Sequence, residues 1–167
     1  SPHQQELKLT LIDGFAGGGV YTHEATRAEV LGSPFVMLDA VRDAEAIINL
    51  ERTKPVRMNV DYFFVERDPS AHASLLHALR ARDYGPRLDA DIRVLNTGFE
   101  TQVEAIRRFV ATKSPRVGRS IFFLDQYGYS DVPTSLIRTI FDELSAAEVI
   151  LTFNVDALIN YASDNGK

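Results

Sequence analysis

The chain has 167 residues, of which 45% are hydrophobic and 25% are charged, so it is long enough for one domain with its own core and is not composed like a disordered segment. Its formal net charge of -5 gives it no general basic field for nucleic acid, and the absence of cysteine excludes disulfides, thiolate metal sites and cysteine nucleophiles. No apolar run approaches the roughly 20 residues of a membrane span and nothing resembles a signal peptide, so the sequence predicts a soluble cytoplasmic protein without a membrane partner.

The chain begins with a polar stretch, residues 1–6, that we interpret as a leader or a tag remnant. An apolar, β-favouring run follows and predicts a first buried strand over Leu7–Ile12. This strand ends in a glycine-rich loop with the sequence Asp13-Gly14-Phe15-Ala16-Gly17-Gly18-Gly19. Glycine allows close approach of the backbone to a ligand because it has no Cβ. The apolar strand and its terminal carboxylate favour a ligand-binding loop over the alternative, a flexible surface loop.

The segment after this loop, Val20–Gly32, is polar, and we expect it to form a short helix or a mobile lid. Ser33 and Pro34 then provide a helix start, with Ser33 as the N-cap and Pro34 at the first helical position. Apolar residues at helical spacing predict one amphipathic helix from Pro34 to about Arg52.

Strands and helices alternate along the rest of the chain. Each predicted strand is short and rich in apolar residues, and each predicted helix carries apolar residues on one face. The predicted strands are Val60–Val65, Ile92–Leu95, Ser120–Leu124 and Glu148–Phe153. The predicted helices are Ser70–Arg82 with Ser70 or Asp68 as its cap, Thr101–Lys113, a helix opened by Val132-Pro133-Thr134, and Val155–Tyr161.

This alternation predicts an α/β fold, with a mainly parallel sheet of at least five strands and helices on both of its faces. We expect residues 1–167 to form a single domain. Because no sixth or seventh strand follows the last predicted helix, we expect the chain to be a fragment of a larger fold.

Polar residues follow the predicted strands at their carboxyl ends, where open parallel sheets bind ligands. Glu66 follows the second strand and is the natural ligand for the vicinal hydroxyls of a ribose, since a carboxylate accepts both of their hydrogen bonds. Its alternative roles are a surface acid paired with Arg67 or a cap of the next helix. Asn96 and Asn154 are more typical of helix caps and turns.

Two common nucleotide-binding motifs do not fit the glycine loop. Gly17 and Gly19 match the first two glycines of G-x-G-x-x-G, but Thr22 occupies the third position. Glu66 lies 47 positions after Gly19, against roughly 20 for the ribose acid of a nicotinamide-binding fingerprint. No Gly-Lys-Ser/Thr follows the glycines, so a Walker-type phosphate loop is also excluded.

The loop from Asp13 to Gly19, together with Glu66 and Asp125-x-x-Gly128, resembles S-adenosylmethionine-dependent methyltransferases, especially the FAGxG loop of nucleic-acid methyltransferases. More specifically, the segments IDGFAGGGVY, GSPFVMLDAV, FFVERD and FFLDQYG resemble the three-Cys-motif partner (TcmP) family of bacterial proteins. The resemblance extends from about Leu9 to Asn160 and implies a Rossmann-like methyltransferase core.

The resemblance implies a role for each part of the site. Glu66 would bind the ribose, and Asp13 would lie near the amino group of the methionine moiety. Residues of the glycine loop would hold that moiety: Asp13, Gly14, Phe15, Ala16, Gly17 and Gly19. Gly98 and Phe99 would lie against the adenine. The residues facing the target atom would be Asp125, Gln126, Tyr127 and Gly128.

This last group departs from the Asp/Asn-Pro-Pro-aromatic motif of amino methyltransferases. Gln126 and Tyr127 replace the two prolines, and Gly128 stands where the aromatic residue would be. The methyl acceptor is therefore open, although the lack of cysteine rules out cysteine-based carbon-5 methylation of cytosine. Methyl transfer to nitrogen or oxygen requires positioning of donor and acceptor and demands no metal.

The sequence thus leads to a methyltransferase core that uses S-adenosylmethionine. The resemblance implies that it acts on nucleic acid, or on a substrate bound by a partner protein encoded alongside it, in a bacterial defence or modification system. The alternative is a non-catalytic module that retains the fold and binds a nucleotide or a partner. A nicotinamide-dependent oxidoreductase is disfavoured by the glycine and acid spacing.

Overall fold

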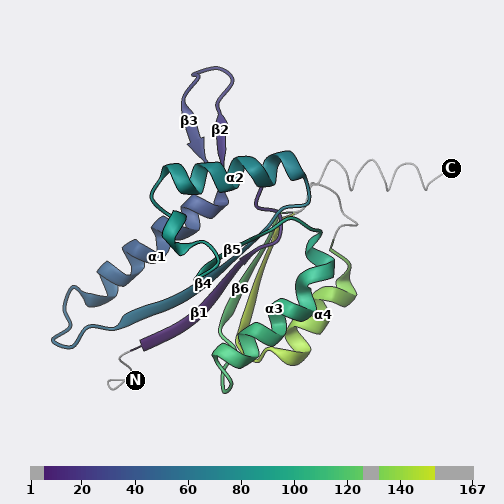
Figure 1. The fold of residues 1–167 in the computed structure, drawn as a ribbon. Coiled ribbons are helices and arrows are strands. Elements are labelled where there is room, and N and C mark those ends of the chain that lie inside the picture. The colour runs from purple at the N-terminus through teal and green to yellow at the C-terminus, as the bar shows by residue number, and fades with distance from the viewer. Residues whose placement is uncertain (1–5, 126–131, 153–167) are drawn as a thin grey trace.

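The computed structural model describes residues 6–125 and 132–152, and its centre is a five-stranded parallel sheet (Figure 1). The spatial order is β5-β4-β1-β6-β7, and every neighbouring pair is parallel. The strands are β1 (Glu6–Asp13), β4 (Arg57–Val65), β5 (Ile92–Leu95), β6 (Ser120–Asp125) and β7 (Ala147–Thr152). The predicted Rossmann-like α/β class is confirmed, and the carboxyl ends of β1, β4, β5 and β6 meet at one edge.

Helices cover both faces of the sheet (Figure 1). Residues of β4 alternate between the faces, since Tyr62 and Phe64 pack in one apolar cluster while Phe63 and Val65 pack in the other. The first cluster includes α1 and α2 and the second includes α3 and α4. The helices are α1 (Ser33–Asn49), α2 (Pro69–Ala81), α3 (Phe99–Lys113) and α4 (Thr134–Glu143), with one 3-10 turn, η1 (Gly85–Arg87).

The segment Val20–Gly32 is a β-hairpin, so the expected short helix is wrong. Its strands β2 (Val20–Thr22) and β3 (Glu29–Leu31) pair antiparallel, and the hairpin projects past α2 in Figure 1. The backbone N–H of Gly32 donates to the carbonyl of Gly19 over 2.7 Å, which closes the base of the hairpin. Three-residue strands are too short to show a clear two-residue period, so the polar tip dominated the sequence pattern.

Two helix starts are settled by the structure. The N-cap of α1 is Gly32, and Ser33 is the first helical residue with no capping bond, so the predicted Ser33 cap is wrong. In α2 the cap is Asp68, whose side chain accepts from the backbone N–H of Ala71 over 2.7 Å. Ser70 lies inside that helix.

Part of the prediction falls outside the described residues, including the helix Val155–Tyr161 and Asn154. The last described strand ends at Thr152, and α1 ends at Asn49, three residues before the predicted boundary. Within residues 6–125 and 132–152, no helix combines the length and the apolar character needed to cross a membrane.

Candidate functional site

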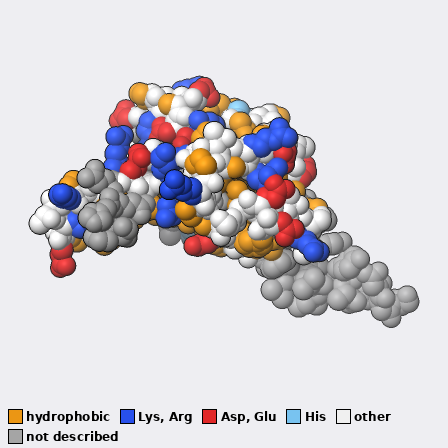
Figure 2. Space-filling view, turned by 90° about the horizontal axis from the view of Figure 1, so that it is seen from below, with side chains coloured by type: hydrophobic (Ala, Val, Ile, Leu, Met, Phe, Trp, Pro, Cys, Tyr) orange, Lys and Arg blue, Asp and Glu red, His pale blue; other side chains and the backbone are white. Residues whose placement is uncertain are grey.

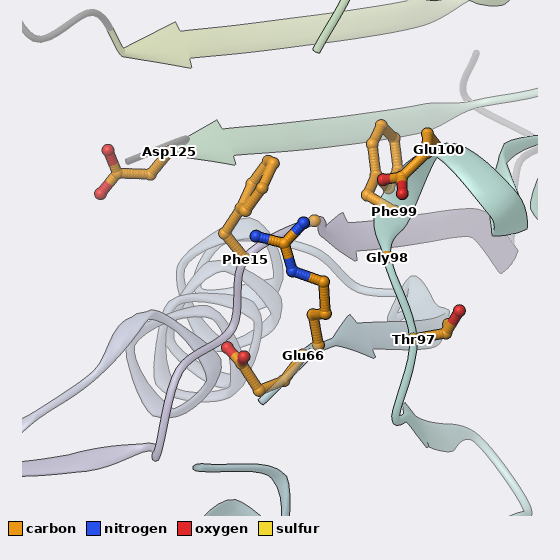
Figure 3. Close-up of a pocket in the computed structure, with 9 residues that line it drawn as sticks. Phe15, Glu66, Thr97, Gly98, Phe99, Glu100 and Asp125 are labelled. Atoms are coloured by element: carbon orange, nitrogen blue, oxygen red, sulfur yellow. The ribbon is translucent and has the colours of Figure 1, made fainter. Parts of the chain in front are cut away.

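A cleft of about 260 Å³ opens at the carboxyl ends of β1, β4, β5 and β6 (Figure 3). This volume is near the lower end of the range for small-molecule sites, about 300 Å³. The lining residues are Gly14, Phe15, Glu66, Arg67, Thr97, Gly98, Phe99, Glu100 and Asp125. The structure therefore brings together six residues that the sequence placed in the site: Gly14, Phe15, Glu66, Gly98, Phe99 and Asp125.

Glu66 joins the end of β4 to the glycine loop. Its Oε2 accepts a hydrogen bond from the backbone N–H of Gly17 over 2.8 Å, and its Oε1 accepts from that of Asp68 over 2.7 Å. A carboxylate has about four acceptor positions, so each oxygen retains one for a ligand. Glu66 makes no ion pair with Arg67 in the described part of the chain, and Asp68 is the helix cap.

The glycine loop is held by the strands on both sides of β1. Gly14 donates its N–H to the carbonyl of Phe123 on β6, and Ala16 donates to that of Val65 on β4, each over 2.9 Å. Gly17 and Gly19 have φ of 64° and 80°, in the left-handed region that favours glycine. Ala16, Gly17 and Gly19 shape the loop beside the cleft without lining it.

Asp13 lies beneath the loop, and its side chain does not line the cleft. The residue is 2% exposed, its Oδ1 accepts from the N–H of Phe15 over 3.1 Å, and its Oδ2 accepts from the hydroxyl of Ser33. Burial raises the pKa of Asp13 to about 6, although both hydrogen bonds lower it; the nearby charges of Asp125 and Glu66 raise it further. Asp13 therefore connects the glycine loop to the start of α1.

The β5 side of the cleft is built on Asn96, Gly98 and Phe99. The side-chain amide of Asn96 donates to the carbonyls of Glu66 and Arg67 over 2.9 and 3.0 Å, so it ties the two strand-end loops together. Gly98 is the N-cap of α3, and the expected capping role of Asn96 is wrong. Phe99 is buried, and its ring packs edge-on against Phe122 at a centroid distance of 6.3 Å.

Asp125 ends β6 and lines the same cleft as Phe15 and Glu66 (Figure 3). Its Oδ1 accepts a hydrogen bond from the hydroxyl of Thr152 on β7. Gln126, Tyr127 and Gly128 lie outside the described residues. The structure therefore describes the start of the predicted target-facing turn and no more of it.

Sequence reasoning did not assign Arg67, Thr97 or Glu100 to the cleft. It also missed two residues that support the site, Asn96 as a clamp and Ser33 as the partner of Asp13. Each signal was ambiguous, because an amide after a strand and a serine before a proline are both common in caps. Among the described residues, no group of three His, Asp or Glu side chains is arranged to hold a metal ion. The cleft instead presents three carboxylates, on Glu66, Glu100 and Asp125, and one guanidinium, on Arg67.

Comparison of the chain with protein-family models and with curated protein sequences finds no match.

Proposed function

We propose that this chain is the cofactor-binding core of an S-adenosylmethionine-dependent methyltransferase. The observation that carries the proposal is the position of Glu66, whose carboxylate lines the cleft while accepting the N–H of Gly17 from the glycine loop. One carboxylate thereby unites the end of β4 with the loop after β1. The resemblance of the loop, Glu66 and Asp125 to this enzyme class, and to the TcmP family, supports the same function.

The residues present fit the cofactor. Its ribose has two vicinal hydroxyls, and the free acceptor positions of Glu66 suit both. Its sulfonium and ammonium groups are cationic, and three of the four charged side chains lining the cleft are carboxylates. A dinucleotide would bring an anionic pyrophosphate into the same acidic cleft, which makes it a poorer ligand. When bound, the cofactor supplies a methyl group on positively charged sulfur for a nitrogen or oxygen acceptor.

The chain's own residues would bind the cofactor and orient the methyl acceptor. Glu66 would hold the ribose, and the backbone of Gly14 and Phe15 would border the methionine side, with Asp13 supporting the loop from below. Gly98 and Phe99 would border the adenine. Asp125 has acceptor capacity beyond its bond with Thr152, so it would orient an N–H or O–H of the methyl acceptor.

The acceptor proposed is nucleic acid or a substrate presented by a partner protein, in a bacterial defence or modification system. Lys and Arg side chains are interspersed with Asp and Glu on the face shown in Figure 2. Such a mixed surface lacks the concentrated positive charge that attracts a phosphate backbone. This observation favours presentation by a partner protein over electrostatic capture through that face.

Titration calorimetry with S-adenosylmethionine, S-adenosylhomocysteine and NAD tests the proposal. We expect micromolar binding of the first two ligands, weaker binding of NAD, and at least a tenfold loss for Glu66→Ala. Glu51→Ala, at an exposed acid outside the cleft, is the control and should bind as the wild type does. Binding of none of the ligands would favour the non-catalytic module, and preference for NAD would favour an oxidoreductase.

A second measurement addresses Asp125. Methyl transfer by the protein should fall by at least tenfold in Asp125→Ala, while the affinity for S-adenosylhomocysteine changes little. Unchanged transfer would remove Asp125 from the acceptor site and leave the cofactor site intact.

A further inference from the structure

The side of the sheet that carries α1 is only partly covered. Among the described elements, α1 packs against β1 and β4 and α2 packs against β5, which leaves β6 and β7 without a helix of their own on this side. Phe122 and Val149 pack with α3 and α4, so the alternation of each strand points Phe123 and Ile150 to the side of α1. Parallel sheets are normally covered on both faces, so this surface is open to a further element.

The open surface is an apolar groove of about 590 Å³ beside α1. Its floor includes Leu11, Ile121 and Phe123, and its wall on α1 includes Val36, Met37 and Ala40. Ile150, next to Phe123 in the register of β6 and β7, continues the floor and is 48% exposed. A continuous exposed apolar surface of this kind marks an interaction site.

Building on the proposed function, we propose that this groove seats one amphipathic α-helix of the partner protein that presents the methyl acceptor. The apolar stripe of that helix packs on the floor and against α1. A Lys or Arg beside the stripe pairs with Glu148.

The dimensions of the groove suit one helix. Neighbouring strands lie about 4.8 Å apart, so β6 and β7 provide a floor about 10 Å wide, which is the diameter of one helix. The six residues of β6 span about 20 Å, a length that a helix of about 14 residues covers. A strand fits less well, because the hydrogen-bonding groups of a sheet lie in its plane and not on its face.

The charges at the margin of the groove favour a basic partner. On the α1 side, Arg42 pairs with Asp39 over 3.1 Å and with Asp43 over 3.6 Å. On the β7 side, the exposed carboxylate of Glu148 makes no hydrogen bond or ion pair within residues 6–125 and 132–152. Arg119 lies at the amino end of the groove, beyond the floor. The formal net charge of -5 also favours a basic partner.

Two other occupants fit the groove less well. If α1 of a second copy filled it, the outer surface of that helix would bury Asp39, Arg42 and Asp43 on an apolar floor, which is costly. The sequence-predicted helix Val155–Tyr161, outside the described residues, would span about 10 Å, or half of the floor. Its one charged residue, Asp156, does not complement Glu148.

One end of the groove lies beside the proposed acceptor site. Phe123 and Ile150 are neighbours on β6 and β7, and two residues further along the strands Thr152 donates a hydrogen bond to Asp125. Two residues of strand span about 7 Å. A helix in the groove therefore brings its own chain close to Asp125, as expected of a partner that carries the methyl acceptor.

Fluorescence anisotropy with a labelled model peptide tests the docking site. The probe is a peptide of about 14 leucine and lysine residues, with leucine at i, i+3, i+4 and i+7, and its scrambled form is the peptide control. The wild type should bind the probe with a dissociation constant below about 100 µM, and the scrambled peptide at least tenfold more weakly. Val36→Arg and Ile150→Arg should each weaken binding of the probe by at least tenfold, because an arginine there is buried under the helix. Glu148→Gln should weaken it by about threefold.

Phe141→Arg is the matched control. Phe141 is 51% exposed, close to the 57% of Val36 and the 48% of Ile150, and it lies on α4, on the opposite side of the sheet. This variant should bind the probe as the wild type does. All four variants should keep the wild-type affinity for S-adenosylhomocysteine, because none of these residues lines the cleft.

A wild type that binds S-adenosylhomocysteine but not the probe would overturn the docking site and leave the proposed function intact. Unchanged binding in Val36→Arg and Ile150→Arg would do the same, and unchanged binding in Glu148→Gln would overturn the basic contact. Binding of the probe only after removal of residues 153–167 would assign the groove to that segment, and a dimer dissociated by Val36→Arg would assign it to a second copy. Either result overturns the partner helix. Failure of the wild type to bind S-adenosylhomocysteine would instead refute the proposed function, whatever the probe does.

Discussion

The backbone N–H of Gly17 donates to Oε2 of Glu66 over 2.8 Å, although 49 positions separate the two residues in the chain. The other oxygen, Oε1, accepts from the N–H of Asp68, where α2 is capped. The carboxylate proposed to bind ribose is therefore also part of what holds the glycine loop and the start of α2. Loop conformation and ligand affinity should respond together when this side chain changes.

Glu66→Ala should lower the free energy of unfolding by about 1–3 kcal/mol, because two backbone donors lose a charged acceptor. Glu66→Gln should cost less, since its amide oxygen still accepts one of the two bonds. Urea unfolding measures both changes, with Glu51→Ala as a control expected within about 0.5 kcal/mol of the wild type. Equal stability of Glu66→Ala and the control would show that the two hydrogen bonds contribute nothing.

The glycine loop offers a comparison of two adjacent positions. Gly19 has φ of 80°, and a Cβ there would lie 2.7 Å from Cδ1 of the buried Leu75. Gly19→Ala should therefore cost about 2–4 kcal/mol, from backbone strain and overpacking together. Gly18 has no positive φ, and a Cβ there would meet nothing nearer than 3.7 Å, so Gly18→Ala should cost less than about 1 kcal/mol. Thermal unfolding that ranks the two variants in the opposite order would contradict the described loop.

The raised pKa of Asp13 predicts that the stability of the fold depends on pH. The folded state holds its proton up to a pKa of about 6, whereas the unfolded state releases it near 3.8. The contribution of Asp13 to stability is thus fully present below pH 3.8 and is lost as the pH rises through 6, a change of roughly 3 kcal/mol.

Asp13→Asn isolates this contribution from those of the other acids. The amide keeps an acceptor for Phe15 and provides a donor toward Ser33, so the fold should be retained. The wild type should lose stability relative to Asp13→Asn between pH 4 and pH 6.5, as measured by urea unfolding at each pH. The raised pKa of Asp13 would be refuted if the difference in unfolding free energy between the wild type and Asp13→Asn stayed constant with pH. It would also be refuted if that difference grew in favour of the wild type as the pH rises.

Substitutions at the start of α2 distinguish Asp68 from Ser70 as the N-cap of this helix. Asp68→Ala removes the acceptor for the N–H of Ala71 and should cost about 1 kcal/mol. Ser70→Ala, inside the helix, should change stability by no more than about 0.5 kcal/mol. A larger loss of stability in Ser70→Ala than in Asp68→Ala would contradict the assignment of Asp68 as the N-cap of α2.

Much of the fold was predictable from the sequence because buried parallel strands are nearly continuous apolar runs. The run from Val60 to Val65 illustrates this, since its residues pack into the clusters on both faces of the sheet. The positions of Glu66 and Asp125 at one edge also follow from parallel strand order. Both residues could therefore be placed near the glycine loop without a structure.

The remaining features depend on contacts that no local pattern records. The hydroxyl of Ser33 bonds to Asp13, 20 positions away, although a serine before a proline is a strong local signal for a cap. Asn96 reaches backbone carbonyls 29 and 30 positions away, and its residue type equally suits a turn. Such polar partners become evident only when the strand ends are brought together.

A crystal structure of the protein with S-adenosylhomocysteine tests the central claim most directly. We predict density for the nucleoside in the cleft, with both ribose hydroxyls within about 3.2 Å of the Glu66 carboxylate and the thioether chain along Gly14 and Phe15. An empty cleft at saturating ligand, or a nucleoside bound away from Glu66, would contradict the account.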